Sequence, residues 1–181
     1  MVVEQVDALR DAIGLAEHCR ARAKIVALTV DADDALIHAI NDSVAPDIFQ
    51  LHGSESPDRV GEIARSTQKE TMKAIKVETS ADAEAAFNYD SITDRILFDA
   101  KAPKGAVLPG GNGLQFDWTA LESVNGRLDY MLSGGLTPET VAAAIRLTGA
   151  KAVDVSSGVE VSPGKKDPVR IRAFLRAAKG L

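Results

Sequence analysis

Two glycine-rich turns near the end of the sequence have the composition of a phosphate-binding site. Each follows a short apolar run, and they read Leu-Ser-Gly-Gly-Leu at residues 132–136 and Val-Ser-Ser-Gly-Val at residues 155–159. Glycine lets a backbone approach an anion closely, and the N–H groups at a helix start point toward it. The residues expected to contact phosphate are Gly134, Gly135, Ser157 and Gly158. The alternative is a pair of ordinary strand-to-helix turns, which suits one such turn better than two.

Three titratable side chains lie within or at the ends of apolar runs and are candidates for acid–base chemistry or ligand binding. Asp99 ends one run, where a carboxyl group can act as a general acid; the alternative is a helix or loop cap. His52 follows another run and can orient a ligand or contact a carboxylate, or else form a structural hydrogen bond. Asp154 lies within an apolar strand, so it must face a ligand or belong to a structural network.

The elements that position these residues alternate between short apolar runs and amphipathic segments, which indicates a parallel sheet wrapped by helices. The expected strands are residues 25–30, 47–51, 72–77, 95–98, 128–132 and 152–155. The expected helices are residues 32–41, 57–66, 81–87, 138–147 and 168–179, with a short one at 117–121. Pro57, Pro138 and Pro168 are placed to begin three of them. In a (β/α)8 barrel, the loops after the last two strands commonly hold phosphate.

The chain opens with an amphipathic helix, because Val2, Val6, Leu9, Ile13 and Ala16 recur at helical spacing. No strand precedes this helix in the sequence. A strand–helix protein normally opens on a strand, so we expect an N-terminal piece to be absent from this chain.

Composition bounds the class of protein. With 181 residues and 45% hydrophobic content, one domain spanning residues 1–181 is expected. The net charge of −5 argues against a nucleic-acid surface, and neither a membrane span nor a signal sequence is evident. The single cysteine, Cys19, excludes a disulfide framework and zinc-ligand spacing, so we expect no metal and a cytoplasmic setting.

Five linked motifs resemble the phosphoribosylanthranilate isomerase family, in the family's order and spacing. They are residues 50–53, 96–99, 109–113 with 116–118, 132–138, and 153–160 followed by 163–164 and 166–167. The resemblance implies an α/β fold of (β/α)8 TIM-barrel lineage and an Amadori rearrangement of N-(5-phosphoribosyl)anthranilate in tryptophan biosynthesis. It implies a small phosphoribosyl substrate and no cofactor. Asp99 would protonate the ribose ring oxygen, and Asp154 would bind substrate.

The same resemblance implies an incomplete barrel with only six strand–helix units. The six expected strands would be the family's third to eighth, so its first strand, first helix and second strand would be absent. The family's general base is a cysteine on the first strand, and Cys19 does not replace it because Cys19 lies near the end of a helix. We expect a truncated chain that is poorly active alone and self-associates through exposed sheet edges.

Two other classes of function stay open. One is a phosphosugar-binding module without catalysis, and the other is an interaction protein whose sheet edges accept a partner chain. Indole-3-glycerol phosphate synthase shares the fold but calls for a catalytic lysine.

The segment 100–116 is expected to form a lid over Asp99, and the alternative is a mobile surface loop without a function. Lys165 and Lys166 are expected to be solvated, or to attract an anion at long range; His18 and His38 should lie on helix surfaces.

Overall fold

A computed structural model describes residues 3–100 and 117–180 of the chain. Six strands form one sheet in the order β1-β2-β3-β4-β5-β6, so each strand follows its sequence neighbour. These strands are β1 (Val26–Thr29), β2 (Ile48–Leu51), β3 (Glu70–Val77), β4 (Arg95–Ala100), β5 (Tyr130–Leu132) and β6 (Ala152–Val153). The β1–β2, β2–β3, β4–β5 and β5–β6 pairs are parallel. The expected α/β class is confirmed.

Helices connect the strands, as the alternation of the sequence predicts. The α-helices are α1 (Val3–Cys19), α2 (Asp34–Val44), α3 (Pro57–Thr67), α4 (Ser80–Glu84), α5 (Val141–Thr148) and α6 (Pro168–Lys179). The 3-10 helices are η1 (Ala85–Asn88), η2 (Trp118–Leu121) and η3 (Ser157–Val159). Pro57 and Pro168 each lie in the first turn of a helix, next to an N-cap side chain that accepts a backbone hydrogen bond.

The chain forms two compact units. Unit 1 contains residues 1–73 and 92–94, and unit 2 contains residues 74–91 and 95–181. The strand β3 contributes its first half to unit 1 and its second half to unit 2. The single domain over residues 1–181 stays a prediction.

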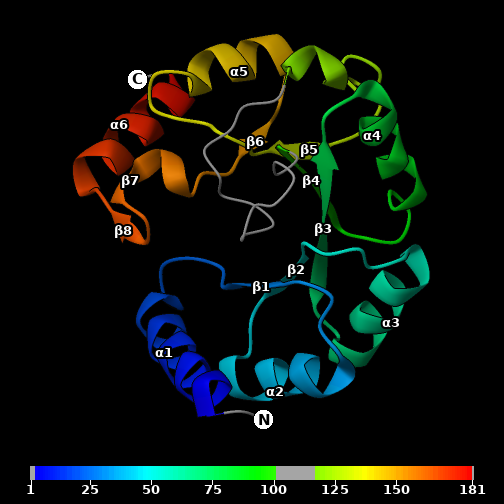
Figure 1. Ribbon diagram of the computed structural model, residues 1–181, viewed down its shortest axis with the longest axis vertical. Coiled ribbons are helices and arrows are strands. Elements are labelled where there is room, and N and C mark those ends of the chain that lie inside the picture. Colours follow the sequence, from blue (N-terminus) through cyan, green and yellow to red (C-terminus); the bar gives the residue numbers. More distant parts are fainter. Residues whose placement is uncertain (1–2, 101–116, 181) are drawn as a thin grey trace. The chain divides into compact units, whose positions relative to one another are not determined.

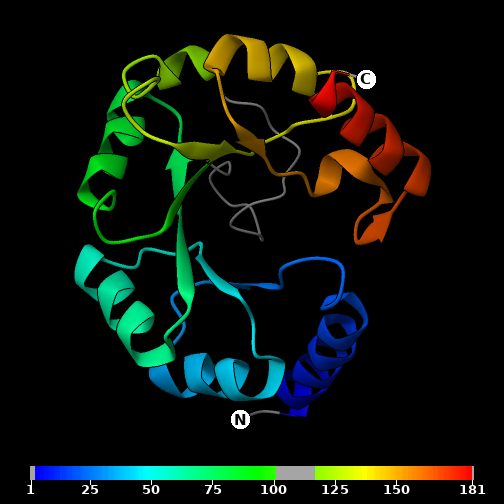
Figure 2. The ribbon, with the colours of Figure 1, turned by 180° about the vertical axis from the view of Figure 1, so that it is seen from behind.

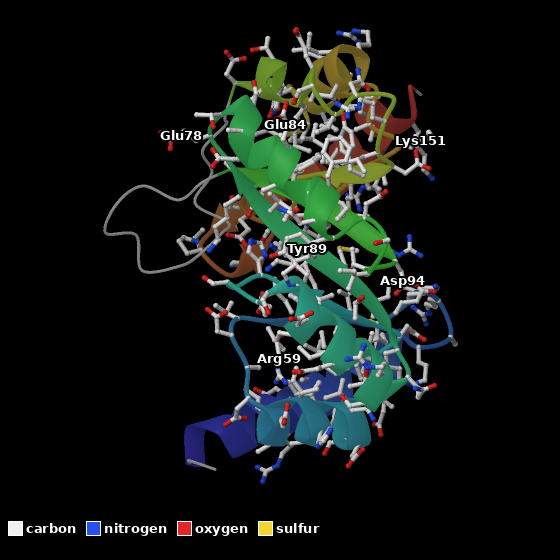
Figure 3. All side chains as sticks on the ribbon, turned by 90° about the vertical axis from the view of Figure 1, so that its right-hand side faces the viewer. Arg59, Glu78, Glu84, Tyr89, Asp94 and Lys151 are labelled. Atoms are coloured by element: carbon white, nitrogen blue, oxygen red, sulfur yellow. The ribbon has the colours of Figure 1, made fainter. Side chains whose placement is uncertain are left out.

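In unit 1, the helices α1, α2 and α3 follow one another, with α1 against α2 and α2 against α3 (Figure 1). The buried core includes Ile37, Phe49 and Ile63. Arg59, labelled in Figure 3, joins α3 to the start of α2 by donating to Asp34 Oδ1 at 2.6 Å. The terminal strand β1 leaves apolar side chains such as Leu28 exposed. Self-association through this edge stays a prediction.

Unit 2 has a contiguous apolar core between its strands and its helices, which are also visible from behind in Figure 2. Phe98 of β4 and Tyr130 of β5 pack edge to face with ring centroids 5.0 Å apart. Leu132 of β5, Ala144 of α5 and Phe174 of α6 belong to the same core. One face of each strand therefore packs into this core, and the alternate side chains point to the opposite face of the sheet.

Several predicted boundaries in unit 2 are wrong. β4 extends to Ala100, so Asp99 lies inside the strand rather than at its end. β6 ends at Val153, so Asp154 comes just after the strand; this terminal strand has a ladder on one side only among the described residues. Pro138 does not begin α5, because the Thr140 hydroxyl accepts from the Thr137 N–H and holds a separate turn first.

The last strand-to-helix connection also differs from the prediction. It contains η3 and then a short antiparallel hairpin of β7 (Glu160–Ser162) and β8 (Lys165–Lys166), before α6 begins. The second glycine turn thus opens a 3-10 helix of three residues rather than a long helix. No helix in the described residues is long and apolar enough to cross a membrane.

Candidate functional site

Asp99, Ser133 and Asp154 form a row across three neighbouring strands, here called the strand-end row. The register pairs Phe98 with Leu132, and Leu132 with Val153, so the row consists of the residue that follows each of these three. The ladder continues into it, because Ser133 N–H donates to Phe98 O at 2.7 Å and Asp154 N–H donates to Leu132 O at 2.8 Å.

The row faces away from the apolar core. Phe98 and Leu132 point into that core, and side chains alternate along a strand, so Asp99 and Ser133 point to the opposite face. Neighbouring strands are about 4.8 Å apart, which separates the backbones of Asp99 and Asp154 by about 10 Å. A span of that width can place a sugar-sized ligand between two carboxyl groups.

Hydrogen bonds hold the strand-end row in place. The Ser133 hydroxyl donates to Asp154 Oδ2 at 2.8 Å. Asp99 is 4% exposed, and its Oδ1 accepts from the Ala100 N–H at 2.9 Å. The expectation that Asp154 belongs to a polar network is therefore met, and a substrate-binding role for it stays a prediction.

The first glycine turn lies against β4. Gly134 and Gly135 have φ values of 85° and 66°, which is a backbone conformation that favours glycine. A Cβ on Gly134 would collide with the backbone and Cβ of Ala100, the residue after Asp99. The backbone of the turn at Gly134 thus packs directly against the residue that follows the candidate acid.

The second glycine turn touches the first. A Cβ on Gly158 would collide with the backbone carbonyl of Leu136, which ends the first turn. The four predicted phosphate contacts are therefore on two turns that lie side by side in unit 2. The first N–H groups of η3, including those of Ser157 and Gly158, have no acceptor within that helix, so they suit an anion.

Two cations anchor the second turn. Lys166 Nζ donates to Ser156 O at 2.9 Å and to Glu160 Oε1 at 2.6 Å. The hydrogen bond from Lys166 lowers the pKa of Glu160 below its ordinary value. Arg170 donates from Nε and a terminal nitrogen to Gly158 O at 3.1 and 3.0 Å. These cations hold the turn directly, and Lys166 does so while its side chain stays 43% exposed, in line with the predicted solvated lysine.

His52 lies in unit 1, whereas the other predicted site residues lie in unit 2. It directly follows β2 and is 6% exposed, and its backbone N–H donates to Thr29 O at 2.8 Å. His18 and His38 are exposed on α1 and α2, as predicted. Cys19 is the last residue of α1, which agrees with its exclusion as a strand-borne base.

Some expected features fall outside the described residues. The predicted lid, including Lys101, Lys104 and the 109–113 motif, lies within residues 101–116 and is not described. Among residues 3–100 and 117–180, no group of three or more His, Cys, Asp or Glu side chains could hold a metal ion.

Three anchoring residues were missed by sequence reasoning: Ser133, Lys166 and Arg170. Ser133 was within a quoted motif, but its bond to Asp154 depends on strand register. The sequence did not indicate which groups Lys166 contacts, and Arg170 is one of several basic residues on α6. A hairpin prediction around Gly164 was the one available signal for Lys166.

Comparison with known families agrees with this arrangement. The family model for N-(5'-phosphoribosyl)anthranilate (PRA) isomerase matches residues 11–177. The chain belongs to this family. It is similar to N-(5'-phosphoribosyl)anthranilate isomerase of Rhodopseudomonas palustris (strain BisA53), with 54% identity over 94% of this chain and 78% of that protein.

Solved structures of the family have the same fold. Phosphoribosyl anthranilate isomerase from Thermotoga maritima is similar with a TM-score of 0.84 and 36% identity, over 96% of this chain and 81% of that chain. A complex of the isomerase with reduced 1-(o-carboxyphenylamino)-1-deoxyribulose 5-phosphate is similar with a TM-score of 0.81 and 33% identity, over 96% of this chain and 80% of that one. The sheet therefore corresponds to part of the (β/α)8 barrel of phosphoribosylanthranilate isomerases.

Proposed function

We propose that this chain carries the acid and the phosphate-binding groups for isomerisation of N-(5-phosphoribosyl)anthranilate to 1-(2-carboxyphenylamino)-1-deoxyribulose 5-phosphate. The observation that supports this most strongly is the strand-end row next to two touching glycine turns. One end of such a site grips a phosphoryl group, and the other end offers carboxyl groups to the sugar. This is the layout that an aldose-to-ketose rearrangement of a phosphosugar needs.

Asp99 acts as the general acid in this proposal. Protonation of the ribose ring oxygen breaks its bond to C1 and gives an open-chain cationic imine. A base then removes the proton on C2 to give an enolamine, which tautomerises to the ketose. The reaction is internally balanced and calls for no redox cofactor. Burial of Asp99 keeps bulk water from competing for its proton.

The other residues bind and orient the substrate. Backbone N–H groups at Gly134, Gly135, Ser157 and Gly158 receive the phosphate, with Lys166 and Arg170 holding the second turn. Asp154, fixed by Ser133, accepts hydrogen bonds from sugar hydroxyls. His52 keeps the substrate-orienting role that the sequence predicts for it.

We assign the role of general base to no residue of this chain. In the family it is a cysteine on the first strand, and the sequence contains only Cys19, at the end of α1. We therefore propose that the chain binds the phosphosugar by itself but turns it over poorly.

A two-part experiment tests this. Reduced 1-(o-carboxyphenylamino)-1-deoxyribulose 5-phosphate is titrated into the chain by calorimetry, and turnover is measured alone and with a separate polypeptide carrying the first strand, helix and second strand of the Rhodopseudomonas palustris relative. Binding with weak turnover that the added polypeptide increases is expected. Absence of binding under both conditions rejects the proposed site. Efficient turnover by the chain alone rejects the proposal that the chain lacks a general base.

A non-catalytic phosphosugar-binding role is the second candidate, and the position of Cys19 favours it. Its signature in the same experiment is binding of the reduced compound with no turnover even when the added polypeptide is present.

A further inference from the structure

Unit 1 contains an ion pair that is almost fully buried. Lys73 Nζ lies 2.6 Å from Glu55 Oε2, and the two side chains are 3% and 2% exposed. Burying two charges is costly, so such a pair persists only where further hydrogen bonds complete its coordination. We call these two residues the buried pair.

The buried pair is fully engaged with the loop after β2. Besides Glu55, Lys73 Nζ donates to Gly53 O at 2.8 Å and to Leu51 O at 3.3 Å, which uses its three N–H donors. Glu55 accepts from the Gly53 N–H at 3.0 Å through Oε2 and from the Asp31 N–H at 2.9 Å through Oε1. Every one of these backbone groups belongs to the ends of β1 and β2 or to the segment after them.

Glu55 is charged in this setting. Burial acts to raise its pKa, but the hydrogen bonds from Lys73 and from the Asp31 backbone outweigh burial and lower the pKa below its ordinary value. Glu55 is therefore a carboxylate at neutral pH, and the hydrogen bonds that it accepts are the strong, charge-assisted kind.

The residue enclosed by these contacts is His52. The two carbonyls that Lys73 binds belong to Leu51 and Gly53, the residues on either side of His52. The loop is also closed sterically, because a Cβ on Gly53 would meet the backbone and side chain of Asp31. The backbone before and after His52 is thus fixed, which sets the direction of its Cα–Cβ bond.

We infer that Lys73 and Glu55 are positioning residues for His52, acting through the backbone carbonyls and N–H groups that flank it. This inference rests on the proposed contact between His52 and the substrate. It assigns a role to two buried charges on β3 and in the β2–α3 loop that the reaction itself does not use.

The alternative is a pair that only stabilises unit 1, and two kinds of variant separate the roles. Lys73→Met and Glu55→Gln each leave one buried group without its partner. The double variant Lys73→Met/Glu55→Leu removes both charges, which restores much of the stability that the single changes lose. Lys24→Met is the matched control, since it breaks an exposed ion pair with Glu70 at 2.8 Å in the same unit.

Two measurements are made on each folded variant. The first is the imidazole region of the 1H–13C NMR spectrum without ligand, where the protein has three histidines and a His52→Asn variant assigns the signal of His52. The second is the Kd of reduced 1-(o-carboxyphenylamino)-1-deoxyribulose 5-phosphate.

We expect the double variant to fold with the His52 signal shifted and the Kd raised about tenfold, as for the loss of one strong hydrogen bond. Lys24→Met should leave both unchanged. An unshifted His52 signal in the folded double variant overturns the inference. A shifted signal with unchanged Kd keeps the positioning of His52 and rejects its contact with substrate, which separates this failure from that of the proposed function.

Discussion

The two ends of the strands in unit 2 carry similar residues in opposite environments. At the amino ends of β5 and β6, a hollow of about 430 Å³ is lined by charged residues and by Gly126 and Gly149, both with positive φ. There Asp129 and Lys151 pair at 2.6 Å while remaining 81% and 77% exposed. At the carboxyl ends, Asp99 is 4% exposed and the glycine turns touch backbone.

Residue type alone does not distinguish a binding site from an ordinary surface in this protein. Glycines, an aspartate and a lysine occur at both ends. Burial of the carboxyl group and close backbone approach occur at the carboxyl ends, where polar groups are costly to bury unless they serve a ligand or a network. Changes at the two ends should therefore differ in their effect on turnover and on ligand affinity.

The largest difference is expected between Asp99→Asn and Asp129→Asn. Loss of a general acid lowers kcat by about 10²–10⁴-fold, while the isosteric amide still allows the substrate to bind. Asp129→Asn changes only an exposed ion pair and should leave kcat and KM unchanged. Both are measured with the added first-strand polypeptide, and equal kcat values for the two variants would remove Asp99 from the mechanism.

The second pair is Gly158→Ala and Gly126→Ala. A methyl group on Gly158 displaces either that turn or Leu136, so stability should fall by roughly 1–3 kcal/mol and affinity for the reduced compound should fall with it. Nothing lies within 4 Å of a Cβ on Gly126, so the strain of its positive φ is the only cost. The affinity for the reduced compound, measured by calorimetry, separates the two variants, since Gly126→Ala is expected to lower stability without lowering this affinity.

A third change tests the hydrogen bond within the strand-end row. Ser133→Ala removes the donor to Asp154 Oδ2, and the loss of one such bond corresponds to about 0.5–1.5 kcal/mol. We expect the free energy of unfolding to fall by this amount and the Kd for the reduced compound to rise roughly two- to tenfold. A purely structural network would lower the stability in the same way and leave the Kd unchanged.

The fourth change lies at the amino end of β5. Tyr130 donates its hydroxyl to Thr148 O at 2.6 Å, and burial raises the pKa of the phenol, so the folded protein favours its neutral form. That contribution to stability is complete below the ordinary tyrosine pKa of about 10 and is lost as pH rises through the higher folded value.

Tyr130→Phe should therefore cost about 1 kcal/mol at neutral pH and remove part of the loss of stability in alkali. Denaturant unfolding at several pH values measures both effects. A change in affinity for the reduced compound would contradict the division between the two ends.

Much of the fold could be predicted because its signals are local. Apolar runs of four to six residues and prolines at helix starts located α3 and α6 closely, and the opening helix was recognised from its spacing. Asp99 was identified from the apolar run before it. The exact end of β4 at Ala100 could not be known, since the residue types around it do not show where a strand stops.

The parts that were missed depend on contacts between distant segments. Lys73 and Lys76 lie three residues apart on β3, so they point to opposite faces, and the sequence does not say which is buried. Only the strand register brings Lys73 to the loop after β2. Ser133 and Asp154 likewise meet because β5 and β6 pair as they do, 21 residues apart in the chain.

The meeting of Gly158 with the carbonyl of Leu136 has a consequence for how this protein can change. Since the two loops touch main chain to main chain, neither can gain a residue or a side chain at that point without moving its neighbour. Redesign for a larger or differently charged ligand must therefore alter both loops together, or work from the outer rim at Lys166 and Arg170, where side chains rather than main chain make the support.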